Sequence, residues 1–330
     1  FLFYIFFELT LIPMVFIIGI WGGEDRMYAA VKFVIYTLVG SLLMLVGVLW
    51  LGFAAGDAVN GGVFTTDWYK LVSFGVPLGS QLWLFALFGL AFAIKVPLFP
   101  LHTWLPDAHT QAPTGGSVIL AGVLLKMGTY GLLRFVVPFF PNASASLAPY
   151  IGVLAVIGIV YGALVAFAQT DVKKLVAYSS VSHLGFVVLG VFAFDIVAVQ
   201  GALIQMVNHG LSTGALFLMI GMMYERRHTR AMADYGGIAK SVPVLTFFML
   251  FSVFASAGLP GLNGFVGEFM ILIGSWNSET LGRPLLIAIA TTGVIFAAVY
   301  LLWMVYSTFF GPVTDDANRQ MEDLNPREII

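Results

Sequence analysis

Six titratable side chains lie inside long apolar segments of this chain, where charged groups are rare. They are Glu8, Lys95, Lys126, His183, His209 and Glu268. Charging an arginine, lysine or aspartate at the centre of a bilayer costs at least ~2.5–3.5 kcal/mol, so each such residue suggests a function or a buried partner. A carboxylate neighbour stabilises the charged form of a buried lysine, and histidine titrates near pH ~6.5 in water. Together the six residues predict a series of groups that take up and release protons inside a membrane.

Further polar residues on the same segments could extend such a path. A stripe along one helix face is predicted for Gln205, His209 and Thr213, with Asn208 and Ser212 beside it. His102 follows Lys95 by seven residues and is a further candidate for the path. Such neighbours are typical of a hydrated interior.

Each of the six residues also has a structural interpretation. Glu8 and Lys95 could form a static buried ion pair, and His183 and His209 could be hydrogen-bonded histidines of the core. Glu268 could face the dipole at the end of a helix. Six such residues on different segments favour ion conduction over these separate explanations.

Two of the apolar segments contain helix breakers next to these residues. Pro97, Pro100 and Pro106 follow Lys95 closely, and proline removes a backbone donor and clashes with the preceding turn. The second interruption, SAGLPGLNGFVGE at 256–268, ends at Glu268. Non-helical backbone at membrane depth survives only against protein or water, so both breaks predict a hydrated path. Asp107 and His109, beyond the prolines, are interpreted as structural.

The composition predicts an all-α polytopic membrane protein. The chain has 330 residues, of which 60% are hydrophobic and 10% charged, whereas soluble domains have about 25% charged residues. Nine segments are long enough to span: 1–20, 30–54, 81–111 (broken), 113–138, 148–169, 175–193, 195–224, 242–275 (broken) and 284–310. The absence of cysteine excludes thiolate iron–sulfur clusters, cysteine zinc sites and disulfides. A net charge of −2 gives no reason to expect nucleic acid.

Lysine and arginine predict the orientation. Loops after odd-numbered spans carry ten basic residues and the opposite loops three, so the positive-inside rule places the odd loops in the cytoplasm. The polar stretch 226–240 is then a solvated cytoplasmic loop. The chain begins at Phe1 inside an apolar run and stops in a polar stretch, so we expect it to be a piece of a longer protein.

Spacing indicates a weak internal repeat. Glu8 precedes Lys95 by 87 residues, and His183 precedes Glu268 by 85. The third and eighth spans are both broken, and five spans separate equivalent positions. An odd offset reverses the topology, which predicts an inverted five-helix repeat. Paired Gly/Pro-interrupted spans in two halves are a pointer to a transport site.

At these residues the chain resembles a known family, the antiporter-like M-type membrane subunits of respiratory complex I, the proton-pumping NADH:quinone oxidoreductase. The stretches that carry the resemblance are FFELTLIPM at 6–14, KVPLFPLHTWLPDAHTQAPTGGSVILAGVLLK at 95–126, QTDVKKLVAYSSVSHLGF at 169–186, NHGLSTGALF at 208–217 and LPGLNGFVGEF at 259–269. Glutamate at position 268, rather than lysine, resembles the M type more than its L and N relatives.

The resemblance implies a fourteen-helix fold of which this chain holds the fifth to thirteenth helices. Residues 1–138 would be the last four helices of the first inverted repeat, 148–310 the second repeat, and 311–330 a cytoplasmic tail leading to a missing last helix. It also implies the roles of the six residues: Glu8 and Lys95 as a pair, Lys126 as the central lysine, His183 and His209 as relays, and Glu268 as the terminal group.

The implied function is proton translocation without redox chemistry in this chain, in a bacterial inner (plasma) membrane. NADH, FMN, iron–sulfur clusters and quinone would be handled by other subunits. The expected partners are protons, lipid and other complex I membrane subunits, including homologous antiporter-like ones. A subunit of a sodium/proton antiporter or of a membrane-bound hydrogenase shares these motifs and stays open. So does a haem protein with His183 and His209 as axial ligands, although this chain lacks the two histidines per helix of typical four-helix cytochromes.

Overall fold

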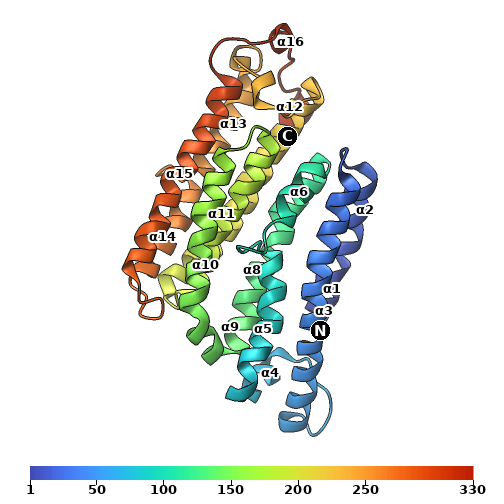
Figure 1. Ribbon diagram of the computed structural model, residues 1–330, viewed down its shortest axis with the longest axis vertical. Helices are drawn as coiled ribbons and strands as arrows, with labels where there is room; N and C mark the ends of the chain where they lie inside the picture. Colours follow the sequence, from blue (N-terminus) through green and yellow to red (C-terminus); the bar gives the residue numbers. More distant parts are fainter. Residues whose placement is uncertain (330) are drawn as a thin grey trace.

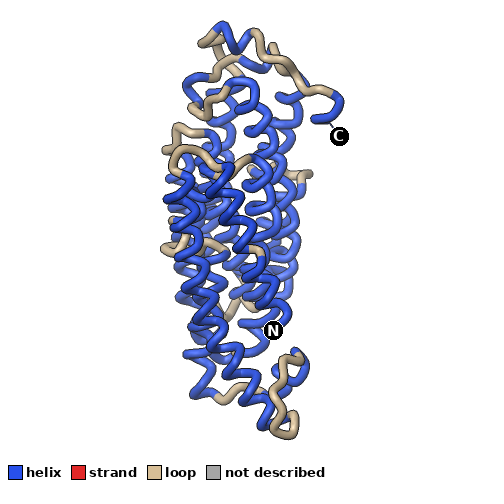
Figure 2. The backbone as a smooth tube through the Cα atoms, turned by 90° about the vertical axis from the view of Figure 1, so that its right-hand side faces the viewer, coloured by secondary structure: helices blue, strands red, loops and turns tan. Residues whose placement is uncertain are grey.

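The computed structural model describes residues 1–329, and residue 330, the last of the predicted tail, lies outside them. Regular structure in the described part is helical, apart from one isolated bridge between Asp171 and Ala231. The helices run nearly parallel to one long axis (Figures 1 and 2). Eight helical runs are long and apolar enough to cross a membrane, and a shorter apolar helix accompanies them. The chain is therefore the multi-pass, all-α membrane protein that its composition predicts.

The first three predicted spans are formed by six helices. They are α1 (Leu2–Leu9), α2 (Leu11–Trp21), α3 (Arg26–Val59), α4 (Trp68–Phe74), α5 (Leu78–Lys95) and α6 (Trp104–Gln111). α1 and α2 make one spanning run of 20 residues, and α4 is a short helix in the loop that leads to α5. In Figure 1 these elements, in blue and cyan, occupy one side of the bundle.

The fourth span is one helical run with two π-helical turns. It consists of α7 (Thr114–Ile119), η1 (Leu120–Leu124), α8 (Leu125–Gly131), η2 (Leu132–Val136) and α9 (Val137–Phe139). Single π turns inside α-helices occur frequently at functional sites. Here η1 ends two residues before Lys126, which lies in the first turn of α8.

The second side of the bundle contains the remaining helices. They are α10 (Pro141–Phe167), α11 (Val172–Phe192), α12 (Ile196–Arg227), η3 (Met232–Asp234), η4 (Ile238–Lys240), α13 (Pro243–Ser256), α14 (Asn263–Trp276), α15 (Pro284–Phe309), α16 (Asp316–Arg319) and α17 (Pro326–Ile329). α11 is the central helix, since it contacts α10, α12, α14 and α15 and 94% of its spanning window is buried. Any site on α11 is therefore shielded from lipid.

Both predicted helix breaks are confirmed. α5 ends at Lys95 and α6 begins at Trp104, with the prolines between them and in the first turn of α6. The indole Nε1 of Trp104 donates to the carbonyl of Ile94 at 2.9 Å, so a side chain satisfies a carbonyl that the interrupted helix leaves free. α13 and α14 have 14 residues each and are separated by Gly258 and Gly261, whose φ angles are +75° and +98°.

The C-terminal residues pack on the end of the bundle that the basic residues assign to the cytoplasm. The carboxylate of Asp323 accepts from the backbone N–H of Val244 and Leu245 at 2.7 and 3.0 Å, which caps α13. The Ala317 N–H and the guanidinium of Arg227 hold the pKa of Asp315 below its ordinary value. The tail therefore fixes one half of the second broken helix.

Candidate proton path

The most tightly joined pair of predicted residues is His183 on α11 and Glu268 on α14. His183 Nδ1 and Glu268 Oε1 share a hydrogen bond of 2.7 Å, and both side chains are only 3% exposed. Gln205 Nε2 donates to the same carboxylate oxygen at 3.1 Å, and the Tyr300 hydroxyl lies 3.2 Å from His183 Nε2. The imidazole thus has a polar partner at each nitrogen, an arrangement that can pass a proton from one side of the ring to the other.

Close backbone contact between α12 and α14 makes this arrangement possible. A Cβ at Gly201 would lie 2.7 Å from the Ile271 nitrogen, and one at Gly267 would lie 2.3 Å from Gln205 Oε1. Only glycine fits at either position without a shift of its neighbours. The two glycines therefore allow Gln205 to reach the carboxylate of Glu268.

A second pair is formed by Lys126 on α8 and His209 on α12. Lys126 Nζ and His209 Nδ1 share a hydrogen bond of 2.6 Å, and Nζ also donates to the Ala121 carbonyl in the π turn η1. A lysine that keeps a main-chain acceptor while contacting an imidazole can give up one proton without losing its position. This pair was predicted as two members of one path, but the sequence did not predict their contact.

The two pairs meet through their histidines. The ring centroids of His183 and His209 are 5.9 Å apart with an angle of 61° between the planes. A narrow void lies beside them, lined also by Gln205, Asn208 and Ser212, and it has no room for a water molecule. His209 Nε2 and Glu268 Oε2 are buried without a hydrogen-bond partner. A small separation of these helices would let water join the two pairs.

Glu8 and Lys95 are not joined in the same way. Among the ion pairs of the described residues none connects them within 4.0 Å, so the static ion pair that spacing allowed is not present. Lys95 is 1% exposed, and its Nζ lies 4.8 Å from the ring centroid of Phe7 and 5.8 Å from that of Phe33. Aromatic faces attract cations, so these rings take the place expected for the carboxylate. Glu8 itself is only partly buried.

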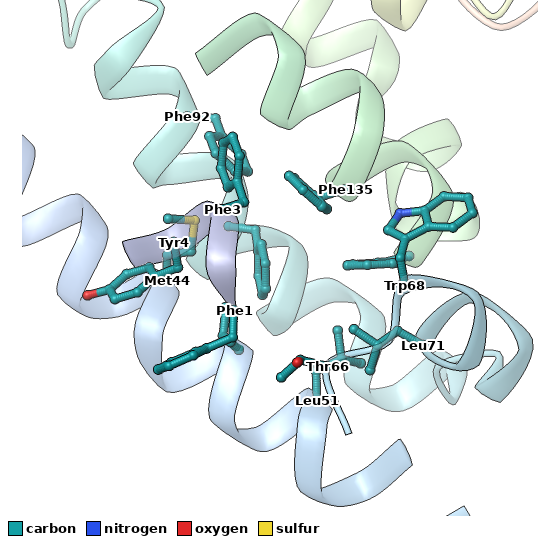
Figure 3. Close-up of a pocket in the computed structure, with 13 residues that line it drawn as sticks. Phe1, Phe3, Tyr4, Met44, Leu51, Thr66, Trp68, Leu71, Phe92 and Phe135 are labelled. Atoms are coloured by element: carbon teal, nitrogen blue, oxygen red, sulfur yellow. The ribbon is translucent and has the colours of Figure 1, made fainter. Parts of the chain in front are cut away.

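Aromatic rings also fill the space on the outer side of Lys95. Phe3 lies 6.1 Å from Phe92 and 4.8 Å from Phe135, between ring centroids. Figure 3 shows these rings around a cavity of about 60 Å³, with Trp68 and Met44 also in its wall. Apolar cavities of this kind stay dry. The first half of the protein therefore has a water-poor layer between Lys95 and the side that the basic residues predict to be the outer one.

His102 and Asp107 lie apart from the two pairs. His102 is 2% exposed, stacks on Phe99 and lies edge-on to Tyr161, and its Nδ1 has no partner. Asp107 forms an ion pair with Lys32 at 2.7 Å, which ties α6 to α3. Asp107 thus has the structural contact that its position near the surface suggested, whereas the role of His102 in the path stays a prediction.

Sequence reasoning missed two residues of this interior, Tyr300 and Lys173. Tyr300 on α15 was not singled out because tyrosines are common in apolar helices. Lys173 is 7% exposed, whereas its neighbour Lys174 is half-buried, and the dipeptide alone does not show which lysine points inward. His109, which the sequence suggested to be structural, is fully buried, and neither of its ring nitrogens has a partner among the described residues.

The geometry does not suit the haem alternative. His183 uses Nδ1 for Glu268 and faces Tyr300 with Nε2, and His209 uses Nδ1 for Lys126. The two rings are nearly in contact, so a porphyrin does not fit between them. Within residues 1–329 no group of three or more His, Asp or Glu side chains is placed to hold a metal ion.

Comparison with known proteins agrees with this architecture. The family model described as "NADH:quinone oxidoreductase/Mrp antiporter, TM" matches residues 1–298. The chain is similar to NADH-quinone oxidoreductase subunit M of Pseudomonas aeruginosa, with 50% identity over 96% of this chain and 62% of the relative. Subunit M of Rhodobacter capsulatus is 46% identical over 99% of this chain and 64% of the relative.

A solved structure extends the likeness to three dimensions. Respiratory complex I from Thermus thermophilus with bound NADH contains a chain with 39% identity and a TM-score of 0.90, and the match covers 99% of this chain and 67% of that one. The chain thus spans somewhat less than two thirds of the length of the curated relatives named above.

Proposed function

We propose that this chain, which belongs to the NADH:quinone oxidoreductase/Mrp antiporter transmembrane family, conducts protons through the membrane as a subunit of an NADH:quinone oxidoreductase. The observation that carries the proposal is the sequence of contacts Lys126–His209–His183–Glu268 across four helices. The relatives named NADH-quinone oxidoreductase subunit M support the choice of enzyme.

The contacts support one order of proton transfer. Lys126 gives a proton to His209 Nδ1, and His209 releases the proton it carries on Nε2, which has no protein partner and faces the void. The step from His209 to His183 has no direct nitrogen–nitrogen bond, so it requires water between the rings. His183 then passes a proton from Nδ1 to Glu268 Oε1. The void excludes water in this conformation. Entry of water into it would therefore switch proton transfer between the two histidines on and off.

Glu8 and Lys95 are proposed as the switch of the first half. In this conformation Lys95 faces aromatic rings and makes no direct ion pair with Glu8. Movement of Glu8 to Lys95 would stabilise the positive charge of the lysine. Departure of Glu8 would leave that charge uncompensated, and its repulsion would drive a proton away from Lys126. One pKa unit of such coupling corresponds to ~1.4 kcal/mol.

The proposal assigns no redox chemistry to this chain. NADH, FMN, iron–sulfur clusters and quinone are proposed to bind other subunits, and the partners are the other membrane subunits, including antiporter-like ones. The location is a bacterial inner membrane, as expected for an enzyme of the kind named in the bacterial relatives. A sodium/proton antiporter subunit stays the second candidate, because the matching family description includes Mrp antiporters. The genes beside this one would separate the two.

The test is proton pumping by the enzyme reconstituted in vesicles with Lys126→Ala in this chain. We expect the protons moved per electron to fall roughly tenfold in this pathway, in line with the loss of a positioned proton-transfer group. Lys240→Ala, which removes a lysine from the cytoplasmic loop, is the matched control and should pump normally. Normal pumping by Lys126→Ala with assembly intact would contradict the proposed function.

A further inference from the structure

We propose that the segment 318–328, which we call the strap, controls proton transfer between His209 and His183 by holding α12 and α13 together on either side of the void. The inference rests on the proposed function and adds regulation of the same path. Its starting point is that side chains of the strap bind the ends of the two helices that line this void.

The void beside the two histidines lies between α12 and α13. Its lining residues on α12 are Gln205, Asn208, His209 and Ser212. Ser256, in the last turn of α13, lines the same void, and its hydroxyl is buried without a hydrogen-bond partner among the described residues. The void has no room for water while the helices hold this position. Its hydration therefore depends on the separation of α12 and α13.

Of these two helices, α13 is the one that is free to tilt. It ends at Ser256, and it is followed by Gly258 and Gly261 with φ angles of +75° and +98°. Residues that absorb backbone changes at the end of an element act as hinges, and glycine does so without a steric penalty. Phe247 and Phe251 on the outer face of α13 are 64% and 54% exposed, so no described element blocks a tilt in that direction.

The strap binds the first turn of α13. The two carboxylate oxygens of Asp323 accept from the backbone N–H of Val244 and Leu245 at 2.7 and 3.0 Å. Just before the helix, the hydroxyl of Ser241 donates to the carbonyl of Arg319 at 3.4 Å. α13 has 14 residues and is therefore about 21 Å long. The strap thus fixes the end of α13 that lies farthest from the glycines.

The strap also binds the last turn of α12. The guanidinium of Arg226 donates to both carboxylate oxygens of Glu328 at 3.0 and 2.7 Å, and to the carbonyl of Asp323 at 3.2 Å. This guanidinium holds the pKa of Glu328 below its ordinary value, so the pair stays ionised. Arg227 donates to Oδ1 of Asn318, which is fully buried, at 2.8 Å. Charged, two-pronged contacts of this kind are strong and geometrically specific.

Asp323 is the residue at which the two attachments meet. Its carbonyl is bound by Arg226 of α12 and its carboxylate by the first turn of α13. Met321 is 7% exposed and belongs to the same apolar cluster as Met223 of α12 and Met249 of α13. Figure 1 shows α16, where the strap begins, over the ends of α12 and α13, and the C-terminus beside α12. The strap closes one end of the seam between the two helices, and the void lies farther along it.

Release of the strap would switch the transfer on. When Asp323 leaves the first turn of α13, the helix tilts about Gly258 and water enters the void. The water oxygen accepts the proton of His209 Nε2, and one of the O–H bonds of the water breaks as its proton binds the ring of His183. No electron is gained or lost, and the water molecule is restored. Asp323 touches neither ring, so it is a positioning residue.

The experiment measures the passive decay of an imposed pH gradient in vesicles that contain the whole enzyme without substrate. We expect Asp323→Ala to speed the decay severalfold, because the void then stays open to water. Combining Asp323→Ala with Glu268→Gln should restore the slow decay, since the leak follows the proton path. Asp316→Ala, which removes an exposed carboxylate just before the strap, is the matched control and should not leak. A leak that persists with Glu268→Gln would be merely structural and would overturn the inference.

Hydrogen exchange provides a reading that does not depend on activity. Loss of a cap alone frays the first turn of α13, whereas release of the strap should also quicken exchange in the last turn near Ser256. If Asp323→Ala does not assemble, Glu328→Gln weakens only the attachment to α12 and should give a smaller leak with the same dependence on Glu268. Quickened exchange in the first turn alone would remove the regulation by the strap but leave the proposed function intact. Normal pumping by Lys126→Ala would remove both.

Discussion

The two halves of the protein treat a buried charge in opposite ways, although each places it beside a broken helix. In the second half Glu268 is hydrogen-bonded to His183 at 2.7 Å and to Gln205. In the first half Lys95 lies against the rings of Phe7 and Phe33 and has no ion-pair partner in this conformation. A directly bonded acid and imidazole suit proton transfer, whereas a charge held by aromatic faces suits a group that changes partners.

The outer sides of the two halves differ as well. Beyond Lys95 the rings of Phe3, Phe92 and Phe135 pack around a dry cavity (Figure 3). Beyond Glu268, two turns along α14, the hydroxyl of Ser275 is buried without a partner. An unpaired hydroxyl can bind water and a phenyl ring cannot. With the predicted orientation, we propose from this comparison that protons leave toward the outer side through the second half.

The largest effect is expected for Glu268→Gln, which tests the second half. The amide keeps the shape and the hydrogen bonds to His183 and Gln205 but cannot ionise. We expect the protein to assemble and proton release to fall roughly tenfold or more, since the terminal proton-transfer group is lost. Proton pumping per electron in reconstituted vesicles measures it.

The matched variant is Glu268→Lys, which keeps a titratable group and should retain part of the function, because the family resemblance implies lysine at this place in related subunits. If Glu268→Gln pumps like the unmodified protein, the exit lies elsewhere and Glu268 serves only to hold α11 against α14. The two halves would then no longer differ in the way proposed.

A severalfold effect is expected for Phe92→Asn, which tests the aromatic layer of the first half. Phe92 is fully buried, and an amide in its place could admit water between Lys95 and the outer side. The expected result is a passive proton leak in vesicles without substrate, measured as faster decay of an imposed pH gradient. Phe92→Leu, which keeps the site apolar, is the control. Equal leak rates for both variants would show that the layer does not act as a barrier.

A smaller effect is expected for the Glu8–Lys95 pair. Because Lys95 has no ion-pair partner here, Lys95→Met should not lower the thermal stability, whereas cutting a formed buried pair typically costs ~3–5 kcal/mol. Glu8→Gln should slow turnover more than Glu8→Asp, since only the aspartate can still approach Lys95 as an anion. Thermal unfolding in detergent and turnover in vesicles provide the two readings. A marked loss of stability in Lys95→Met would show that a pair is formed in solution, and identical turnover of both Glu8 variants would remove the switch.

The helices and their breaks could be predicted from the sequence because both depend on local chemistry. Long apolar runs require helices, and Pro97 with its neighbours and the glycines near 258–261 cannot continue one. The six titratable residues were visible for the same reason, since an ionisable group in an apolar run stands out. The inverted repeat and the orientation stay predictions.

The partners of these residues could not be predicted, because a pair depends on how distant helices rotate against each other. Their opposite charges and the family resemblance suggested Glu8 with Lys95, but the rotation of α1 presents Phe7 to the lysine instead. Lys126 contacts His209 and also a carbonyl of the π turn η1, and neither contact has a signature in the sequence. Lys173 and Lys174 differ in burial because the rotation of α11 about its axis turns only Lys173 inward.

The smallest effect is expected at the first break, where a single hydrogen bond joins its two sides. Trp104 Nε1 donates to the Ile94 carbonyl at 2.9 Å, and both groups are buried. The second break has another kind of link, since Asn208 Nδ2 of α12 donates to the Asn263 carbonyl at 2.7 Å. Trp104→Phe keeps an aromatic ring and removes only the donor, which leaves the carbonyl unsatisfied at a cost of about 1–3 kcal/mol.

We therefore expect Trp104→Phe to lower the thermal stability modestly and to leave Glu268-dependent proton release unchanged. The loss should be confined to the first half, where hydrogen exchange of the last turn of α5 should quicken. Asn208→Leu acts on the second break and should instead slow pumping, because Asn208 also lines the void beside the two histidines. If Trp104→Phe slows proton release as much as Asn208→Leu does, the two breaks serve one path equally. The distinction between a switching half and a transferring half would then be wrong.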